Sequence, residues 1–260
     1  MTDVQDFYAQ LGEGEWSRFD QPLQRVEFMG SMRLIDRYIS ADMNVCDLGC
    51  GPGRYSIELL RRGNHVTLVD LTPELLDAAK SRIEREGLHA DGFIVADARS
   101  VDALPADGFD AVLVMGPLYH LDGNDRPAVL AQAKRILRPG GIAILTYLNA
   151  WGLVRTGVTD FPARYVDADF VASLRAPGNL GIWHYTTPVA AREELTTAGL
   201  SVETYAGLEG FLGGMSLPLG QLKQDYPDAY VQATNAAVES GELPEYRDGT
   251  DHLTFVCRNG

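Results

Sequence analysis

The chain has 260 residues, 45% of them apolar, which is enough for one large domain or one domain with a smaller appendage. Its formal net charge of -14 disfavours nucleic acid and anionic membranes as partners, because both are bound through clustered Lys and Arg. Three cysteines indicate neither a disulfide framework nor a zinc site. We expect a cytoplasmic protein, since the sequence shows no secretion leader and no apolar run of the ~20 residues that span a bilayer.

Short β-branched segments alternate with helical ones from residue 44 to about 148, which predicts a parallel sheet with crossover helices. Residues 1–43 precede this pattern and are expected to form an N-terminal helical cap. Thr72 and Pro73 mark the start of a helix, and a further helix is expected over Arg126–Leu137. The predicted strands are Asn44–Leu48, His65–Asp70, Gly92–Ala96, Phe109–Met115 and Ile142–Leu148.

The alternation breaks after residue 149 and resumes near the C-terminus. It predicts a helix over Pro188–Ala198 and strands over Val202–Tyr205 and His252–Cys257, which complete the sheet. Two irregular segments, about 150–187 and about 207–250, interrupt this second half. We therefore expect a sheet domain over residues 44–260 that carries these two segments as cap insertions.

A glycine-rich loop follows the first predicted strand, in Val45-Cys-Asp-Leu-Gly-Cys-Gly-Pro-Gly-Arg-Tyr55. Glycines at 49, 51 and 53 permit positive φ and let a ligand approach the main chain closely. In an open parallel sheet, ligands bind beyond the carboxyl ends of the strands, where this loop lies. The next strand ends in Asp70, 21 residues after Gly49, where an acid can accept both hydrogen bonds of a ribose diol. The spacing predicts an adenosine-containing ligand.

The residues around the loop favour a ligand without phosphate. Pro52 removes one N–H donor and Asp47 places a carboxylate beside the loop, both of which disfavour a pyrophosphate. Arg54 stands where the dinucleotide pattern has its third glycine, and the sequence has no Gly-Lys pair for a kinase-like phosphate loop. A dinucleotide-binding oxidoreductase is the less favoured alternative.

Four motifs together resemble the class I S-adenosylmethionine-dependent methyltransferases: Asp47-Leu-Gly-Cys-Gly-Pro-Gly53, Asp70, Ala96-Asp97-Ala98 and Leu137-Arg-Pro-Gly-Gly141. The resemblance implies an α/β fold with a Rossmann-like doubly wound sheet of seven strands, the last antiparallel, and S-adenosylmethionine as cofactor. It implies Gly49, Gly51 and Gly53 beneath the methionine part and Asp47 near its ammonium. It also implies Asp70 on the ribose and Asp97 and Ala98 on adenine, and adds Leu71 and Met115 to the cofactor site.

The stretch Met115-Gly-Pro-Leu-Tyr-His-Leu121 resembles one in a bacterial branch of the family that acts on small molecules. Methyl transfer depends mainly on alignment, and only the acceptor can need deprotonation. His120 is the candidate general base, with a purely hydrogen-bonding role as the alternative. The candidate substrate-binding aromatics, for which ordinary packing is the alternative, are Tyr8, Trp16, Tyr119, Trp151 and Trp183.

The expected reaction is methyl transfer to N, O, S or C of a small molecule. We expect no metal in the mechanism, because the acids and histidines lack a recognisable ligand spacing. The sequence does not indicate the oligomeric state. Two alternatives keep the same pocket: an enzyme that uses the cofactor without methylation, such as by intramolecular cyclisation, and a binding protein without activity.

Overall fold

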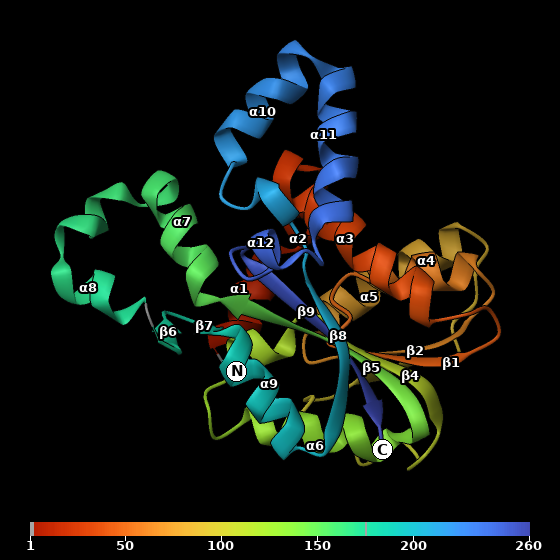
Figure 1. Ribbon diagram of the computed structural model, residues 1–260. Helices are drawn as coiled ribbons and strands as arrows, with labels where there is room; N and C mark the ends of the chain where they lie inside the picture. Colours follow the sequence, from red (N-terminus) through yellow and green to blue (C-terminus); the bar gives the residue numbers. More distant parts are fainter. Residues whose placement is uncertain (1–2, 175) are drawn as a thin grey trace.

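The computed structural model describes residues 3–174 and 176–260 (Figure 1). Helical segments precede the sheet: α1 Asp3–Leu11, α2 Glu13–Ser17, the 3-10 turn η1 Arg18–Asp20, and α3 Pro22–Tyr38. Pro22 lies in the first turn of α3, where a missing N–H costs no intrahelical hydrogen bond. Among the described residues, no helix combines the length and the apolar composition that crossing a membrane requires.

One sheet contains the nine strands of the described residues. They are β1 Asn44–Leu48, β2 His65–Asp70, β3 Gly92–Val95, β4 Phe109–Val114, β5 Leu137–Asn149, β6 Gly178–Leu180, β7 Trp183–Thr186, β8 Leu200–Gly207 and β9 His252–Asn259. The first five pair in the order β3-β2-β1-β4-β5 and run parallel. The last strand, β9, runs antiparallel between β5 and β8. The predicted Rossmann-like sheet with an antiparallel last strand is confirmed.

The hairpin of β6 and β7 adds two strands to the predicted seven. β7 pairs with Leu148 and Asn149 of β5, and β9 also pairs with Leu148, so β7 and β9 lie on opposite edges of β5. The pairing of β4 with β5 ends at Leu145. β4 and β7 therefore pair with the same edge of β5, and β7 pairs with the residues of β5 that lie beyond the end of β4. Strands this short carry little periodicity, which is why the sequence showed only an irregular segment here.

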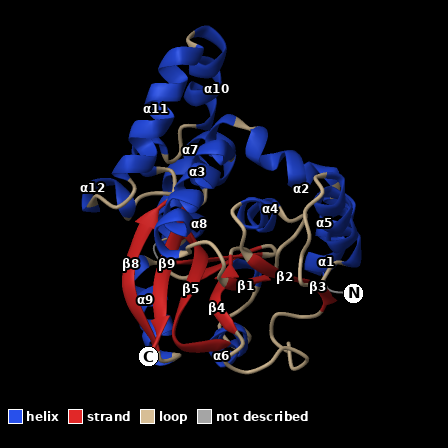
Figure 2. Cartoon of the chain, turned by 90° about the vertical axis from the view of Figure 1, so that its right-hand side faces the viewer, coloured by secondary structure: helices blue, strands red, loops and turns tan. Residues whose placement is uncertain are grey.

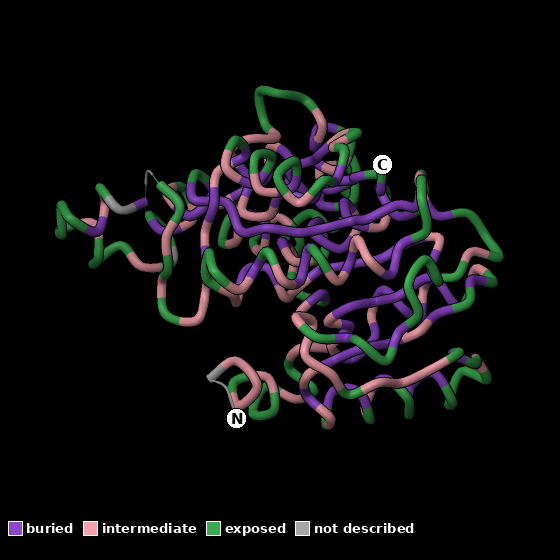
Figure 3. The backbone as a smooth tube through the Cα atoms, turned by 90° about the horizontal axis from the view of Figure 1, so that it is seen from below, coloured by how far each residue is buried: buried purple, intermediate pink, exposed green. Residues whose placement is uncertain are grey.

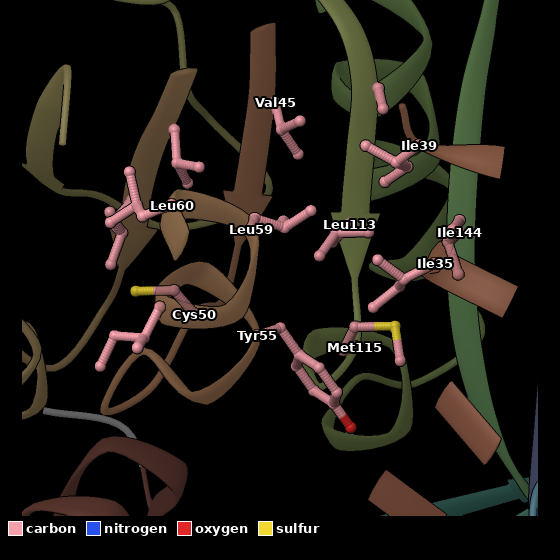
Figure 4. Close-up of a cluster of buried hydrophobic side chains, with 14 of the residues drawn as sticks. Ile35, Ile39, Val45, Cys50, Tyr55, Leu59, Leu60, Leu113, Met115 and Ile144 are labelled. Atoms are coloured by element: carbon pink, nitrogen blue, oxygen red, sulfur yellow. The ribbon is translucent and has the colours of Figure 1, made fainter. Parts of the chain in front are cut away.

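Two layers of helices cover the sheet, because successive side chains of a buried strand point to opposite faces. In β4, Leu113 packs with α3, α4 Arg54–Arg61 and α5 Pro73–Arg85, whereas Val112 and Val114 pack with α6 Arg126–Ile136 and α9 Pro188–Thr197. The strands run as buried segments through the centre of the molecule (Figure 3). Figure 4 shows the first of these clusters, with Met115 directly after the end of β4 and Tyr55 beside it.

Two insertions extend from the sheet domain. The first contains α7 Ala150–Asp160, the turn η3 Pro162–Val166, α8 Ala168–Ser173 and the β6–β7 hairpin. The second contains the turn η4 Gly210–Leu212, α10 Ser216–Asp225, α11 Pro227–Ser240 and α12 Pro244–Arg247. Leu23 and Val26 of α3 pack with Leu212, Leu219 and Tyr230. The second insertion therefore packs against the N-terminal segment (Figure 2).

The helix predicted to start at Thr72 and Pro73 is present as α5, but its first turn is not capped by the Thr72 side chain. Thr72 is the N-cap residue by position, but its side chain makes no capping hydrogen bond. Instead its backbone N–H donates to Oδ1 of Asp70 at 2.8 Å. The carboxylate at the end of β2 therefore satisfies the donor at the start of α5.

Candidate functional site

The loop between β1 and α4 places three glycines in the left-handed region, with φ of 84° at Gly49, 51° at Gly51 and 84° at Gly53. A Cβ at Gly49 would meet the ring of Pro117 at 2.4 Å, and one at Gly53 would meet Ala79 at 3.0 Å. A Cβ at Gly51 would project into open space. Gly49 and Gly53 are thus required by packing, whereas Gly51 keeps a ligand surface free of side chain.

Asp70 holds this loop in place through a hydrogen bond to its backbone. Its Oδ2 accepts the backbone N–H of Gly51 at 2.7 Å, and its Oδ1 accepts that of Thr72. The carboxyl group is nearly buried, and burial raises its pKa. The side chain of Thr72 and the backbone of Leu71 contribute further hydrogen bonds, which act against the effect of burial on this pKa.

Asp47 lies fully buried at the end of β1. Its Oδ2 accepts the hydroxyl of Ser56 at 2.6 Å, while its buried Oδ1 has no hydrogen-bond partner within the part of the chain that the structure describes. Burial raises the pKa of this carboxyl group to about 7. An ammonium group near Oδ1 would satisfy the buried acceptor and favour the ionised form.

A first cavity of ≈ 110 Å³ lies over the glycine loop. Its walls include six residues that the sequence singled out: Tyr8, Gly49, Gly51, Met115, Tyr119 and His120. Four further wall residues were not among the candidate site residues of the sequence: Glu15, Arg18, Phe19 and Tyr55. Arg54, noted in the sequence only for replacing a glycine, also lines this cavity.

A second cavity of ≈ 240 Å³ lies beside the first. It is lined by Leu71, Asp97 and Ala98, as well as by Val4, Arg99, Leu121 and Asp125, which the sequence did not indicate as site residues. Pro117 and His120 line both cavities, so the turn after β4 forms the partition between them. Tyr8 of α1 lines the first cavity and Val4 of α1 lines the second, so the α1 helix borders both.

His120 lies in the 3-10 turn η2 Pro117–His120, after β4. Its Nδ1 is 3.1 Å from the carbonyl oxygen of Ile182, which can only accept, so we assign the ring hydrogen to Nδ1. Nε2 is then a bare acceptor and receives the hydroxyl hydrogen of Tyr8 at 2.8 Å. Burial lowers the pKa of His120 to about 4, so the ring is neutral at pH 7.

An aromatic cluster surrounds His120. The ring centroids of Trp183, Tyr119 and Tyr8 lie 4.6, 4.9 and 5.3 Å from that of His120. Phe7 packs on the outer side of this cluster, 5.9 Å from Trp183. Trp183 is the first residue of β7. Because β7 pairs with β5 beyond the end of β4, it lies close to η2, the turn that follows β4. Three of the five candidate aromatics, Tyr8, Tyr119 and Trp183, therefore meet at the candidate base.

The other two tryptophans lie elsewhere. Trp16 is held between the guanidinium groups of Arg54 and Arg82, at 4.4 and 4.3 Å from its ring, and does not line either cavity. Trp151 is 44% exposed and borders a surface groove with Arg192 and Tyr205. The sequence groups both with the substrate-binding aromatics, but neither of them lines the first or the second cavity. Trp183 does not line either cavity itself and joins the site through its contact with His120.

A buried ionic network adjoins the first cavity. Arg18 donates through Nη1 and Nη2 to both oxygens of Glu27, at 2.6 and 3.1 Å, and through Nε to Glu15 at 3.2 Å. His252 lies between Glu209, at 2.6 Å, and Glu27, at 3.9 Å. Burial alone would lower the pKa of His252, but the two carboxylates outweigh it and raise the pKa to about 9.

Glu27, Glu209 and His252 are also the one group of metal-ligand type found among the described residues, with ligand atoms within 4.8 Å of one another. The sequence indicated no such group, because its members lie on α3, after β8 and at the start of β9. In the structure they are engaged as ion pairs, with Arg18 and the imidazolium supplying the positive charge.

These residues fit the cofactor that the resemblance implies. Gly51 leaves bare backbone in the wall of the first cavity, and the second cavity has the Asp97–Ala98 pair for a purine. Asp47, Gly53 and Asp70 line neither cavity, and the orphaned Oδ1 of Asp47 is a buried acceptor that an ammonium would suit. None of these features needs a phosphate group.

Comparison with known proteins agrees with this chemistry. The family described as "Methyltransferase domain" matches residues 45–141. The ubiquinone biosynthesis O-methyltransferase of Xanthomonas axonopodis pv. citri (strain 306) is 31% identical over 208 residues, which cover 78% of this chain and 82% of that protein.

Two solved structures share the fold. A S-adenosylmethionine-dependent methyltransferase from Mesorhizobium loti matches with a TM-score of 0.59 and 18% identity, over 90% of this chain and 97% of that one. The 1,6-didemethyltoxoflavin-N1-methyltransferase of Burkholderia thailandensis, solved with bound 1,6-didemethyltoxoflavin and S-adenosylhomocysteine, matches with a TM-score of 0.57 and 15% identity, over 98% of this chain and 86% of that one. The chain belongs to the class I S-adenosylmethionine-dependent methyltransferases.

Proposed function

We propose that this enzyme methylates a hydroxyl oxygen of a small molecule, with His120 as the general base. The observation that carries the proposal is the hydrogen bond at Nε2 of His120, which already receives a phenolic hydroxyl, that of Tyr8, at 2.8 Å. An acceptor hydroxyl at the same position would donate to a neutral imidazole in the same way. Curated relatives that are 30–31% identical to this chain are named O-methyltransferases, which supports oxygen over nitrogen, sulfur or carbon.

The proposed cofactor position follows the two cavities. The methionine part would lie in the first, over Gly51, with its ammonium toward Asp47. Arg18 would face the methionine carboxylate, since the described contacts use three of its five N–H groups. Asp70 would receive the ribose hydroxyls, and Asp97 and Ala98 the adenine. When bound, S-adenosylmethionine supplies a methyl group on a positively charged sulfur, and the neutral thioether that departs needs no acid.

The residues of the turn after β4 would align and deprotonate the acceptor. Tyr119 and Trp183 present aromatic faces beside His120, and such faces suit a flat acceptor. Nε2 holds the acceptor hydroxyl by a hydrogen bond. A hydroxyl oxygen becomes strongly acidic as it gains a carbon substituent, so Nε2 is able to take its proton although the pKa of His120 is only about 4.

The helical segment of residues 1–43 and the two insertions would act as the cap over this site. From the N-terminal segment, Tyr8 lines the first cavity and Val4 the second. From the first insertion, Trp183 packs on His120. Exclusion of water by such a cap would strengthen the interactions that orient the acceptor.

The test is a product analysis with a cofactor that carries a trideuterated methyl group and a panel of phenols, matched anilines and thiophenols. Mass spectrometry should find the label on oxygen of at least one phenol, and His120→Ala should abolish most of it. Label found only on nitrogen, sulfur or carbon would overturn the oxygen acceptor. Label on oxygen at the same rate with His120→Ala would overturn the base.

A further inference from the structure

Arg54 brings a cation into the wall of the first cavity. It is the first residue of α4, directly after the glycine loop, and it lines the cavity together with Glu15 and Arg18. The charge of Arg18 is balanced by ion pairs with Glu15 and Glu27. The Arg54 guanidinium, by contrast, makes no hydrogen bond or ion pair with any residue that the structure describes. Two arginines therefore face one cavity, and only one of them is paired.

Aromatic rings hold the Arg54 guanidinium in position. Its central carbon, Cζ, lies 4.4 Å from the ring centroid of Trp16, 5.2 Å from that of Phe28 and 5.6 Å from that of Phe19. A guanidinium over an aromatic face is attracted to the π-electrons of the ring, and this contact uses none of its five N–H donors. The donors of Arg54 therefore remain available to a ligand, in the fork geometry that matches a carboxylate.

The surroundings of Arg54 favour a negatively charged ligand. The side chain is partly buried, and burial lowers the pKa of Arg54, since the attraction of Asp20 offsets the lost hydration only in part. An arginine stays protonated at neutral pH all the same. An anion in contact with the guanidinium would compensate the charge that burial has partly removed from water.

We propose that Arg54 binds a carboxylate group of the methyl acceptor, so that the substrate is a hydroxy-substituted carboxylic acid. This rests on the proposed function, which puts the acceptor hydroxyl at His120, because Arg54 and His120 line the same cavity. The neutral imidazole would hold the hydroxyl end of the acceptor and the guanidinium its acidic end. A carboxylate suits this wall better than a phosphate, whose second negative charge would be repelled by Glu15.

The experiment measures binding of small phenolic acids to the full chain that already holds S-adenosylhomocysteine, by calorimetry. The probes are para-hydroxybenzoate, para-hydroxyphenylacetate and para-hydroxyphenylpropionate, which increase in length, each paired with its neutral primary amide. The wild type should bind at least one acid more tightly than its amide. Arg54→Ala should reduce this preference by about 10-fold or more, because charge-assisted hydrogen bonds are lost. Arg54→Lys should retain part of it, since the charge stays but the bidentate geometry does not.

Arg25→Ala is the matched control. The Arg25 guanidinium also lies over Phe28, with its Cζ 5.5 Å from the ring centroid, but Arg25 lines neither cavity. This variant should leave the preference for the acid unchanged. Arg54→Ala should also leave the affinity for S-adenosylhomocysteine unchanged, because the methionine carboxylate is assigned to Arg18.

Three results would overturn the proposal. The first is a wild type that binds no acid more tightly than its amide, and the second is a preference that survives Arg54→Ala. The third is weaker binding of S-adenosylhomocysteine to Arg54→Ala with an unchanged ratio of acid to amide affinity, which would assign Arg54 to the methionine carboxylate. No methyl group is transferred in this measurement, so a failure of the proposed O-methylation is detected separately in the product analysis.

Discussion

The hydroxyl of Tyr8 lies 2.8 Å from Nε2 of His120, although 112 positions separate the two residues in the chain. Tyr8 belongs to the first helix and His120 to the turn after β4, and this contact joins the N-terminal segment to the sheet at the partition between the two cavities. The phenol therefore stands where the acceptor hydroxyl is proposed to bind.

If the acceptor must displace this hydroxyl, removing it should help binding. We expect Tyr8→Phe to lower the acceptor KM by up to about 10-fold with little change in kcat, because a typical hydrogen bond contributes ~0.5–1.5 kcal/mol. Initial-rate kinetics measure both constants. The control is Tyr165→Phe, on the first insertion and outside both cavities. A large loss of kcat in Tyr8→Phe would instead make the phenol part of the proton transfer.

The low pKa of His120 sets the pH dependence of turnover. Only the neutral ring can accept a proton, and burial lowers its pKa to about 4, so kcat should be nearly constant from about pH 5 to pH 8 and fall only below about pH 4. His120→Ala should lose about 10²- to 10⁴-fold in kcat. His120→Asn still accepts a hydrogen bond but takes up no proton. Full activity of the Asn variant with the same profile would leave His120 only a positioning role.

Gly51 and Gly63 allow backbone strain to be separated from ligand contact. Both have positive φ, 51° and 82°, and at both a Cβ would project into open space, but only Gly51 lines a cavity. Substitution by Ala should therefore destabilise each variant by a similar ~1–2 kcal/mol. Only Gly51→Ala should weaken binding of S-adenosylhomocysteine, which calorimetry and thermal unfolding together would show. Equal affinities of the two variants would argue against a ligand on the loop.

The two ion pairs of His252 with the buried Glu209 and Glu27 predict a stability change in alkali. The pKa of His252 is raised to about 9 in the folded state, against ~6.5 for an unperturbed histidine. Its stabilising contribution is therefore fully present below about pH 6.5 and is lost as the pH rises through about 9. We expect the Tm of the wild type to fall over this range more steeply than that of His252→Gln.

The exposed His65 supplies the control for that measurement, since it lies at the start of β2 away from the network. His65→Gln should keep the steep fall of the wild type. Parallel Tm curves for wild type and His252→Gln would assign the alkaline loss to other groups.

The strands and the conformation of the glycine loop could be predicted from the sequence because their signals are local. The strand pattern from residue 44 to about 148, the glycine spacing and Asp70 at the end of β2 lie within short windows, where the periodicity of side chains and the freedom of glycine leave few alternatives. The parallel sheet of the first five strands and the antiparallel β9, both confirmed, follow from the same periodicity combined with the resemblance to the family, whereas the order of the strands is known only from the structure.

Only the tertiary structure decided which distant side chains share the site. Trp183 reaches His120 because β7 continues along the edge of β5 beyond β4, and no local pattern in so short a strand records this pairing. The same holds for the bridge from Arg99 to Asp125 and for the contact of His252 with Glu27, which join segments that lie far apart in the chain. Trp151 shows the converse: its place after β5 suggested a site residue, but its side chain points to the surface. Sequence fixes local conformation through short-range sterics and periodicity, whereas contacts between distant segments are set by packing of the whole chain.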